Sequence, residues 1–244
     1  MRSFFEPAFL RHIPDELLAV TDQVRAATGI PVTVKAMPPV AAEEDAHARP
    51  PAVANIDGFT HSITIIVNSE LVQPSHVAHE LIHLRRYLLE SVCMLWPAEG
   101  ATPYDVNWIV NVDNSLEHLL VVPEEIAAGD GAEQWWIAHY EALVELTGPN
   151  WLGQTMHLLF LRAVLPTQHA LHARCEEFIE LTGAGQLEKA RLVSDNALAA
   201  LPSKRKLIDV VRPLLPPELQ TRMALACYAA RDGRIALRDA SLAS

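Results

Sequence analysis

The chain has 244 residues, of which 50% are hydrophobic and 20% are charged, so it can bury a sizeable core and is not disordered as a whole. Its formal net charge of −11 argues against non-specific nucleic-acid binding by the whole surface. There is no apolar run long enough to span a bilayer and no signal-peptide pattern at the start, so we expect a cytoplasmic protein with no membrane partner.

The N-terminal part is predicted to be one helix followed by short strands. The helix runs from about Pro14 to Thr28 and is closed by Gly29. Runs rich in β-branched residues predict three strands, at Pro31–Met37, Ala52–Ile56 and Ser62–Val67. An acidic, proline-rich stretch, 38–51, separates the first two strands, and Asp57-Gly58 turns between the last two. We expect a small antiparallel sheet.

The remainder is predicted to be helical. A helix starts at Pro74-Ser75, a proline- and glycine-rich break covers 96–103, and a second helix runs from Asn114 to Val121 and ends at Pro123. Further helices are predicted at Trp151–Leu165, Thr167–Thr182, Gln186–Leu201, Lys204–Leu214 and Pro217–Ala230. The predicted class is therefore α+β, mainly helical, with one domain over 1–148 and an all-helical C-terminal part over 149–244.

The most informative motif is His79-Glu80-Leu81-Ile82-His83. Residues four apart on a helix share one face, so both imidazoles can reach one zinc ion. Glu80 is offset around the helix, which leaves it available to take a proton from a water that the zinc activates. The alternative is a pair of histidines packed on an ordinary amphipathic helix.

A catalytic zinc site needs a third protein ligand. The predicted one is Glu117, because a glutamate on a later helix often completes a site with two histidines. Glu117 can instead be the third residue of a capping box that starts at Asn114. Asp113 and His118 are the other candidate ligands, and Asp113 can also orient a ligand from behind it.

Cys93 follows the motif helix and is a possible inhibitory fourth ligand, because a thiolate in the open position would displace water. In a straight helix it lies roughly 15 Å beyond His83, so it reaches the metal only if the chain bends back. The alternative is a small buried core residue. Cys93, Cys175 and Cys227 include no close pair, which suits a reducing compartment. The basic run Lys204-Arg205-Lys206 is predicted to be a solvated helix start.

Residues 62–123 resemble the ImmA/IrrE-like zinc metallopeptidases. The resemblance rests on the strand that ends in Val67-Asn68-Ser69, on 78–83 and on the helix with Asn114, Leu116 and Leu119–Pro123. This helix departs from the family pattern, because it has Leu116-Glu117 where the family usually has Phe-Ala, and Val112-Asp113 precedes Asn114. The long helical tail lies outside the resemblance.

The resemblance implies a zincin-like metallopeptidase domain, Zn²⁺ as cofactor, and a protein substrate such as a helix-turn-helix repressor in bacterial stress or anti-phage regulation. Two other functions stay open from the residues alone. One is a regulatory binding protein with a structural or vestigial metal site, and the other is a zinc hydrolase of a non-peptide substrate. The intact Glu80 favours catalysis, because a structural zinc site needs no neighbouring base.

Overall fold

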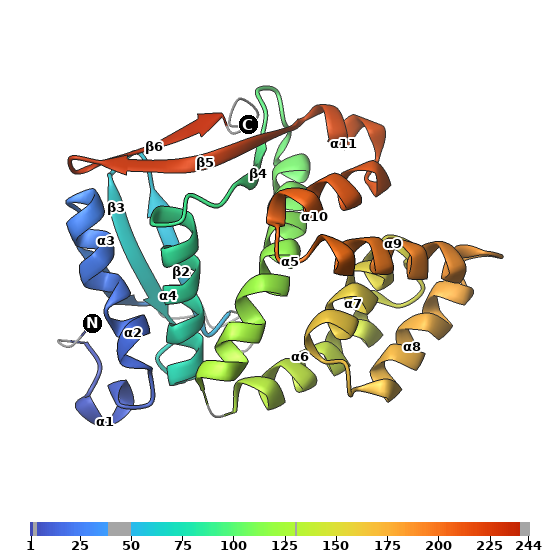
Figure 1. Ribbon diagram of the computed structural model, residues 1–244, viewed down its shortest axis with the longest axis horizontal. Helices are drawn as coiled ribbons and strands as arrows, with labels where there is room; N and C mark the ends of the chain where they lie inside the picture. The colour runs from blue at the N-terminus through green and yellow to red at the C-terminus, as the bar shows by residue number, and fades with distance from the viewer. Residues whose placement is uncertain (2–3, 39–49, 130, 240–244) are drawn as a thin grey trace. The chain divides into compact units, whose positions relative to one another are not determined.

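The computed structural model describes residues 1, 4–38, 50–129 and 131–239, so 39–49 of the acidic stretch lie outside the described residues. The protein is α+β and 58% helical, with two three-stranded sheets (Figure 1). The chain forms two compact units. The first contains Met1–Cys93, Glu124–Ala132 and the C-terminal residues from Ala226, and the second contains Met94–Pro123 and Glu133–Leu225. The division of the chain at residue 148 stays a prediction.

Three short helices open the first unit: α1 (Pro7–Leu10), α2 (Asp15–Leu18) and α3 (Val20–Thr28). The predicted helix from Pro14 to Thr28 is therefore two helices, which meet at Ala19 with helical backbone angles. Gly29 ends α3 as predicted, with φ of 76°. A left-handed residue at this position closes a helix, and glycine adopts that conformation without steric cost.

The first sheet consists of β1 (Val32–Ala36), β2 (Ala52–Asp57) and β3 (Ser62–Val67), in the order β1-β3-β2. The predicted hairpin of β2 and β3 is confirmed, because these strands pair antiparallel. The prediction of a wholly antiparallel sheet is wrong, because β1 pairs parallel with β3. The strand β3 is the most apolar and takes the centre, and the long connection after β1 allows the parallel entry.

The motif helix is α4 (Pro74–Leu88), which contacts α2, α3 and β2. Pro74 occupies its first turn, where the missing N–H costs no helical hydrogen bond. Every residue from Ser75 to Leu84 is buried, so this is an interior helix and not a surface helix with one apolar face. The motif histidines are consequently held by packing on all sides of α4.

The structure corrects the prediction for the segment after α4. The break over 96–103 contains part of a short strand, β4 (Met94–Pro97), and the helix predicted over Asn114–Val121 is part of a much longer helix, α5 (Pro103–Ala128). This helix continues through Pro123, which we expected to end it. Val121 and Val122 are fully buried, and their packing offsets the backbone hydrogen bond that Pro123 cannot donate.

The helices of the second unit from Trp151 to Leu214 follow the prediction closely: α7 (Trp151–Val164), α8 (His169–Glu180), α9 (Gln186–Ala200), α10 (Lys204–Val211) and the 3₁₀ turn η2 (Arg212–Leu214). Most of α6 (Ala132–Thr147) also lies in this unit, and the sequence patterns did not predict it. Helix α7 contacts α8 and α9, and α9 contacts α10 (Figure 1). Phe160 and Leu161 of α7 lie in the core of this group. Within the described ranges, every helix is too short or too polar to cross a membrane.

The prediction of an all-helical C-terminal part is wrong at its end. The short helix α11 (Pro217–Thr221) is followed by two strands, β5 (Met223–Arg231) and β6 (Arg234–Asp239), which pair antiparallel. Asp232 and Gly233 turn between them with φ of 52° and 75°. An Asp-Gly pair in this conformation is a strong hairpin signal, and it outweighs the helix propensity of the alanines in β5.

Candidate metal centre

Helix α4 presents the motif residues from a buried position. His79, Glu80 and His83 are each at most 8% exposed. The Nε2 atoms of His79 and His83 lie 3.0 Å apart. Two imidazole lone pairs at this distance repel each other unless a proton or a metal ion lies between them. Two nitrogens on one tetrahedral zinc ion would be roughly 3.3 Å apart, so the two rings already have the spacing of a chelating pair.

Glu125 supports His79 from behind. Its Oε2 atom lies 2.8 Å from His79 Nδ1, and its side chain is 1% exposed. A carboxylate in this position accepts a hydrogen bond from the Nδ1–H group. This favours the tautomer whose Nε2 lone pair is free for a metal ion, and it fixes the ring orientation. Sequence reasoning missed Glu125 because it placed the end of the helix at Pro123. The available signal was a carboxylate on the helix that follows the motif.

His118 is the candidate ligand from the second unit. It lies on α5, where its ring meets the Trp136 ring edge-on at 5.1 Å. From the sequence, His118 is an alternative to Glu117 as third ligand. Three imidazoles form a donor set that is well suited to zinc.

The acidic candidates on α5 are engaged by a lysine. Lys204 Nζ lies 2.9 Å from Glu117 Oε2 and 3.0 Å from Asp113 Oδ2, and the Lys204 side chain is 1% exposed. Asp113 also accepts a hydrogen bond from the Leu95 N–H. Burial raises the pKa of Asp113, and the Lys204 charge opposes this rise. The basic run does start α10, and Arg205 and Lys206 are exposed as predicted. The prediction of a solvated position is wrong for Lys204, because two carboxylates hold it in the interior.

Glu117 forms an ion pair with Lys204 in the second unit, and its role as third metal ligand stays a prediction. The capping-box alternative is wrong, because Asn114 lies in the interior of α5 and not at its start. Asp113 has Leu95 and Lys204 as partners, so its main contacts serve the packing of α5.

Glu80 lies against the edge of the first sheet. Its Oε2 atom accepts a hydrogen bond of 2.6 Å from the Ala54 N–H in β2. The strand β2 is at the edge of its sheet, so this N–H points away from β3. Burial raises the pKa of the Glu80 carboxyl, while His79 and the Ala54 N–H act in the opposite direction. A buried glutamate with a raised pKa is well placed to accept and return a proton.

Cys93 follows a reversal of the chain. Ser91 has φ of 52°, and the Val92 N–H bonds back to the Arg86 carbonyl at 3.0 Å. The chain thus bends back after α4, which is the condition that the switch hypothesis requires. Cys93 is a half-buried free cysteine. Its role as an inhibitory ligand stays a prediction.

Comparisons of the chain with family models, with curated proteins and with solved structures found no match. The case for a metal centre therefore rests on residues of the first unit: two motif histidines on α4, a buried carboxylate behind His79 and a buried glutamate beside it.

Proposed function

We propose that this chain is a zinc-dependent metallopeptidase with His79, His83 and His118 as the metal ligands. The observation that carries the proposal is the close approach of the His79 and His83 Nε2 atoms, 3.0 Å apart, on a helix that also carries the buried Glu80. We propose His118 as the third ligand because Lys204 pairs with the two competing carboxylates, those of Asp113 and Glu117. The residues fit the ion, because the Glu125 contact at Nδ1 favours the His79 tautomer that offers its Nε2 lone pair to the metal. A zinc ion held there would polarise the scissile carbonyl and acidify the attacking water.

The chain's own residues then perform the proton transfers. Glu80 takes the proton of the attacking water and passes it to the nitrogen of the leaving amine. Its burial raises its pKa, which makes it a better proton acceptor than an exposed glutamate. Glu125 keeps the His79 ring in place throughout. A structural metal site would need no such base beside it, so Glu80 favours the enzyme over the regulatory binding protein.

A peptide is the substrate class that best fits the surroundings of Glu80. Glu80 occupies the Ala54 N–H of the edge strand β2, and an extended peptide can bind the remaining backbone groups of such an edge. A strand edge beside the proposed base favours a peptidase over a hydrolase of non-peptide substrates. The resemblance of residues 62–123 to the ImmA/IrrE-like metallopeptidases supports a protein partner, and we propose a helix-turn-helix repressor.

Two measurements test this function. Metal analysis of the purified chain should find one zinc per chain, and the double variant His79→Ala, His83→Ala should contain none. Co-expression with a repressor from a neighbouring gene should give a specific cut that Glu80→Gln abolishes while it retains zinc. Glu70→Gln, at an exposed position before α4, is the control and should cleave the repressor as wild type does. If the chain binds the repressor but never cuts it, the chain is a regulatory binding protein and not a peptidase.

A further inference from the structure

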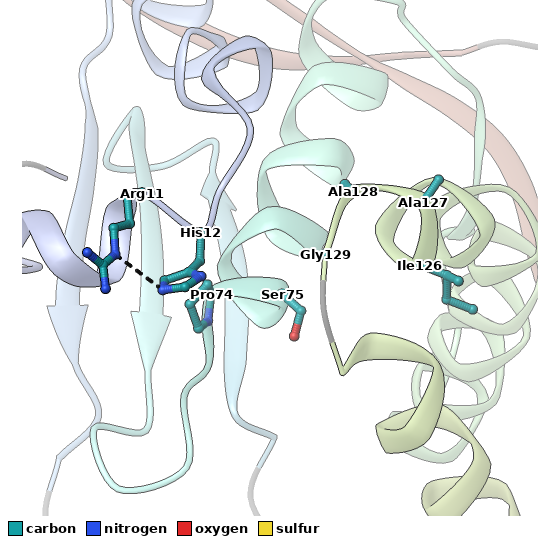
Figure 2. Close-up of a pocket in the computed structure, with 8 residues that line it drawn as sticks. All are labelled: Arg11, His12, Pro74, Ser75, Ile126, Ala127, Ala128 and Gly129. Carbon is teal, nitrogen blue, oxygen red and sulfur yellow. Dashed lines mark hydrogen bonds between the residues drawn. The ribbon is translucent and has the colours of Figure 1, made fainter.

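The first compact unit contains a cavity of about 530 Å³ at the start of α4. Its wall comes from three segments: Arg11 and His12 after α1, Pro74 and Ser75 in the first turn of α4, and residues 126–129 at the end of α5 (Figure 2). None of these residues is a proposed metal ligand or the proposed base. The cavity is therefore a separate feature of the unit.

The N-terminus of α4 gives one wall of this cavity a positive potential. The backbone dipoles of a 15-residue helix place partial positive charge at its first turn. Pro74 has no N–H, and the N–H groups of His76 and Val77 bond to the Gln73 carbonyl. Ser75 thus supplies the first N–H of the helix at the cavity wall. Helix N-termini of this kind bind anions.

The Ser75 side chain independently indicates a ligand. The residue is only 4% exposed, and its Oγ atom has no hydrogen-bond partner among the described residues. Figure 2 shows the hydroxyl directed away from the body of α4. Buried hydroxyl groups in proteins nearly always have a partner, and each exception needs an explanation. A ligand oxygen in the cavity would provide that partner.

Arg11 supplies a full positive charge at the same cavity. Its Nε atom lies 3.4 Å from His12 Nε2, and no carboxylate of the described residues forms an ion pair with it. A guanidinium group presents several N–H donors in a plane, which matches the oxygens of a phosphate group. Arg11 and the backbone and side chain of Ser75 thus give the lining of this cavity three donor groups, which favour an anionic ligand.

We propose that this cavity binds a phosphate group, either as free phosphate or as part of a phosphorylated small molecule. The cavity is much larger than a phosphate ion, and Ile126, Ala127 and Ala128 give it an apolar wall against which an organic group can pack. The site is one helical turn from His79, since Ser75 and His79 are four residues apart on α4. It does not depend on the proposed metal or on catalysis.

Calorimetric titration of the full chain with inorganic phosphate, in phosphate-free buffer at constant ionic strength, tests the proposal. Wild type should bind phosphate saturably, and Ser75→Ala and Arg11→Gln should each weaken binding at least about tenfold. Two matched variants should bind as wild type does. Ser194→Ala removes another buried hydroxyl without a partner, and Arg25→Gln removes another exposed arginine of the same unit.

Further arms separate this site from other sources of phosphate binding. The double variant His79→Ala, His83→Ala should retain phosphate binding, whereas loss of binding there would place phosphate on the metal and overturn the proposal. Glycerol phosphate that binds more tightly than free phosphate supports an organic ligand, and equal binding of acetate overturns the choice of phosphate. Equal phosphate affinity of wild type and Ser75→Ala would also overturn the proposal. Thermal melts check that each variant is folded.

Discussion

Replacement of Glu125 with alanine should weaken zinc binding while the chain stays folded. The Glu125 carboxylate accepts a hydrogen bond of 2.8 Å from His79 Nδ1, and both side chains are at most 10% exposed. A hydrogen bond to a charged group in such a place contributes about 1.5–3 kcal/mol. This corresponds to roughly a 10- to 150-fold loss in affinity. The effect agrees with the 10- to 100-fold typical of residues that support a metal-binding histidine.

Competition with a chromophoric chelator at one fixed pH measures this loss, since zinc affinity itself varies with pH. Glu124→Ala is the matched control, because Glu124 is the adjacent residue and pairs with Arg85 instead of a histidine. Glu125→Gln keeps an acceptor oxygen without the charge and should give a smaller loss than Glu125→Ala. The reasoning is refuted if Glu125→Ala binds zinc as tightly as wild type, or if Glu124→Ala weakens zinc binding equally.

Five further substitutions, of which Arg205→Met is a control, probe the assignments around the site. His118→Ala should lose most of the zinc affinity whereas Glu117→Gln should keep it, and chelator competition that gives the reverse order would restore Glu117 as the ligand. Lys204→Met should leave buried carboxylates uncompensated and destabilise the chain by roughly 3–5 kcal/mol. For a chain of this size that lowers the melting temperature by roughly 6–20 °C, and Arg205→Met, at an exposed position, should change it little. Cys93→Ala should cleave faster than wild type if the thiolate blocks the metal, and a rate assay that shows no increase would remove the switch.

The parts of the fold that local patterns specify were predicted from the sequence. The hairpin of β2 and β3, the motif helix and the helices from Trp151 to Val211 all follow from short-range periodicity and turn residues. The errors have two causes. Packing overrides a local signal at Pro123, where buried valines carry α5 through the proline. Two local signals compete at the end of the chain, where the Asp232-Gly233 turn makes strands of a segment whose alanines favour a helix.

The candidate site divides in the same way. His79, Glu80 and His83 lie within one helical turn and a half, so their spacing alone predicts that they share a site. Glu125 is 46 positions from His79, and its position depends on the continuation of α5 past a proline. No local pattern carries that information.

The choice between Glu117 and His118 depends on a still more distant residue. Adjacent residues on a helix point about 100° apart, so the two side chains cannot both face the same neighbour. Lys204, which is 91 positions after Asp113, contacts the face of α5 that carries Asp113 and Glu117. A buried ammonium group needs compensating carboxylates, so Lys204 pairs with Asp113 and Glu117, the two acidic residues that the sequence pattern offered as metal ligands. A neutral imidazole needs no such partner, so we propose His118, and not Glu117 with its lysine partner, as the third ligand.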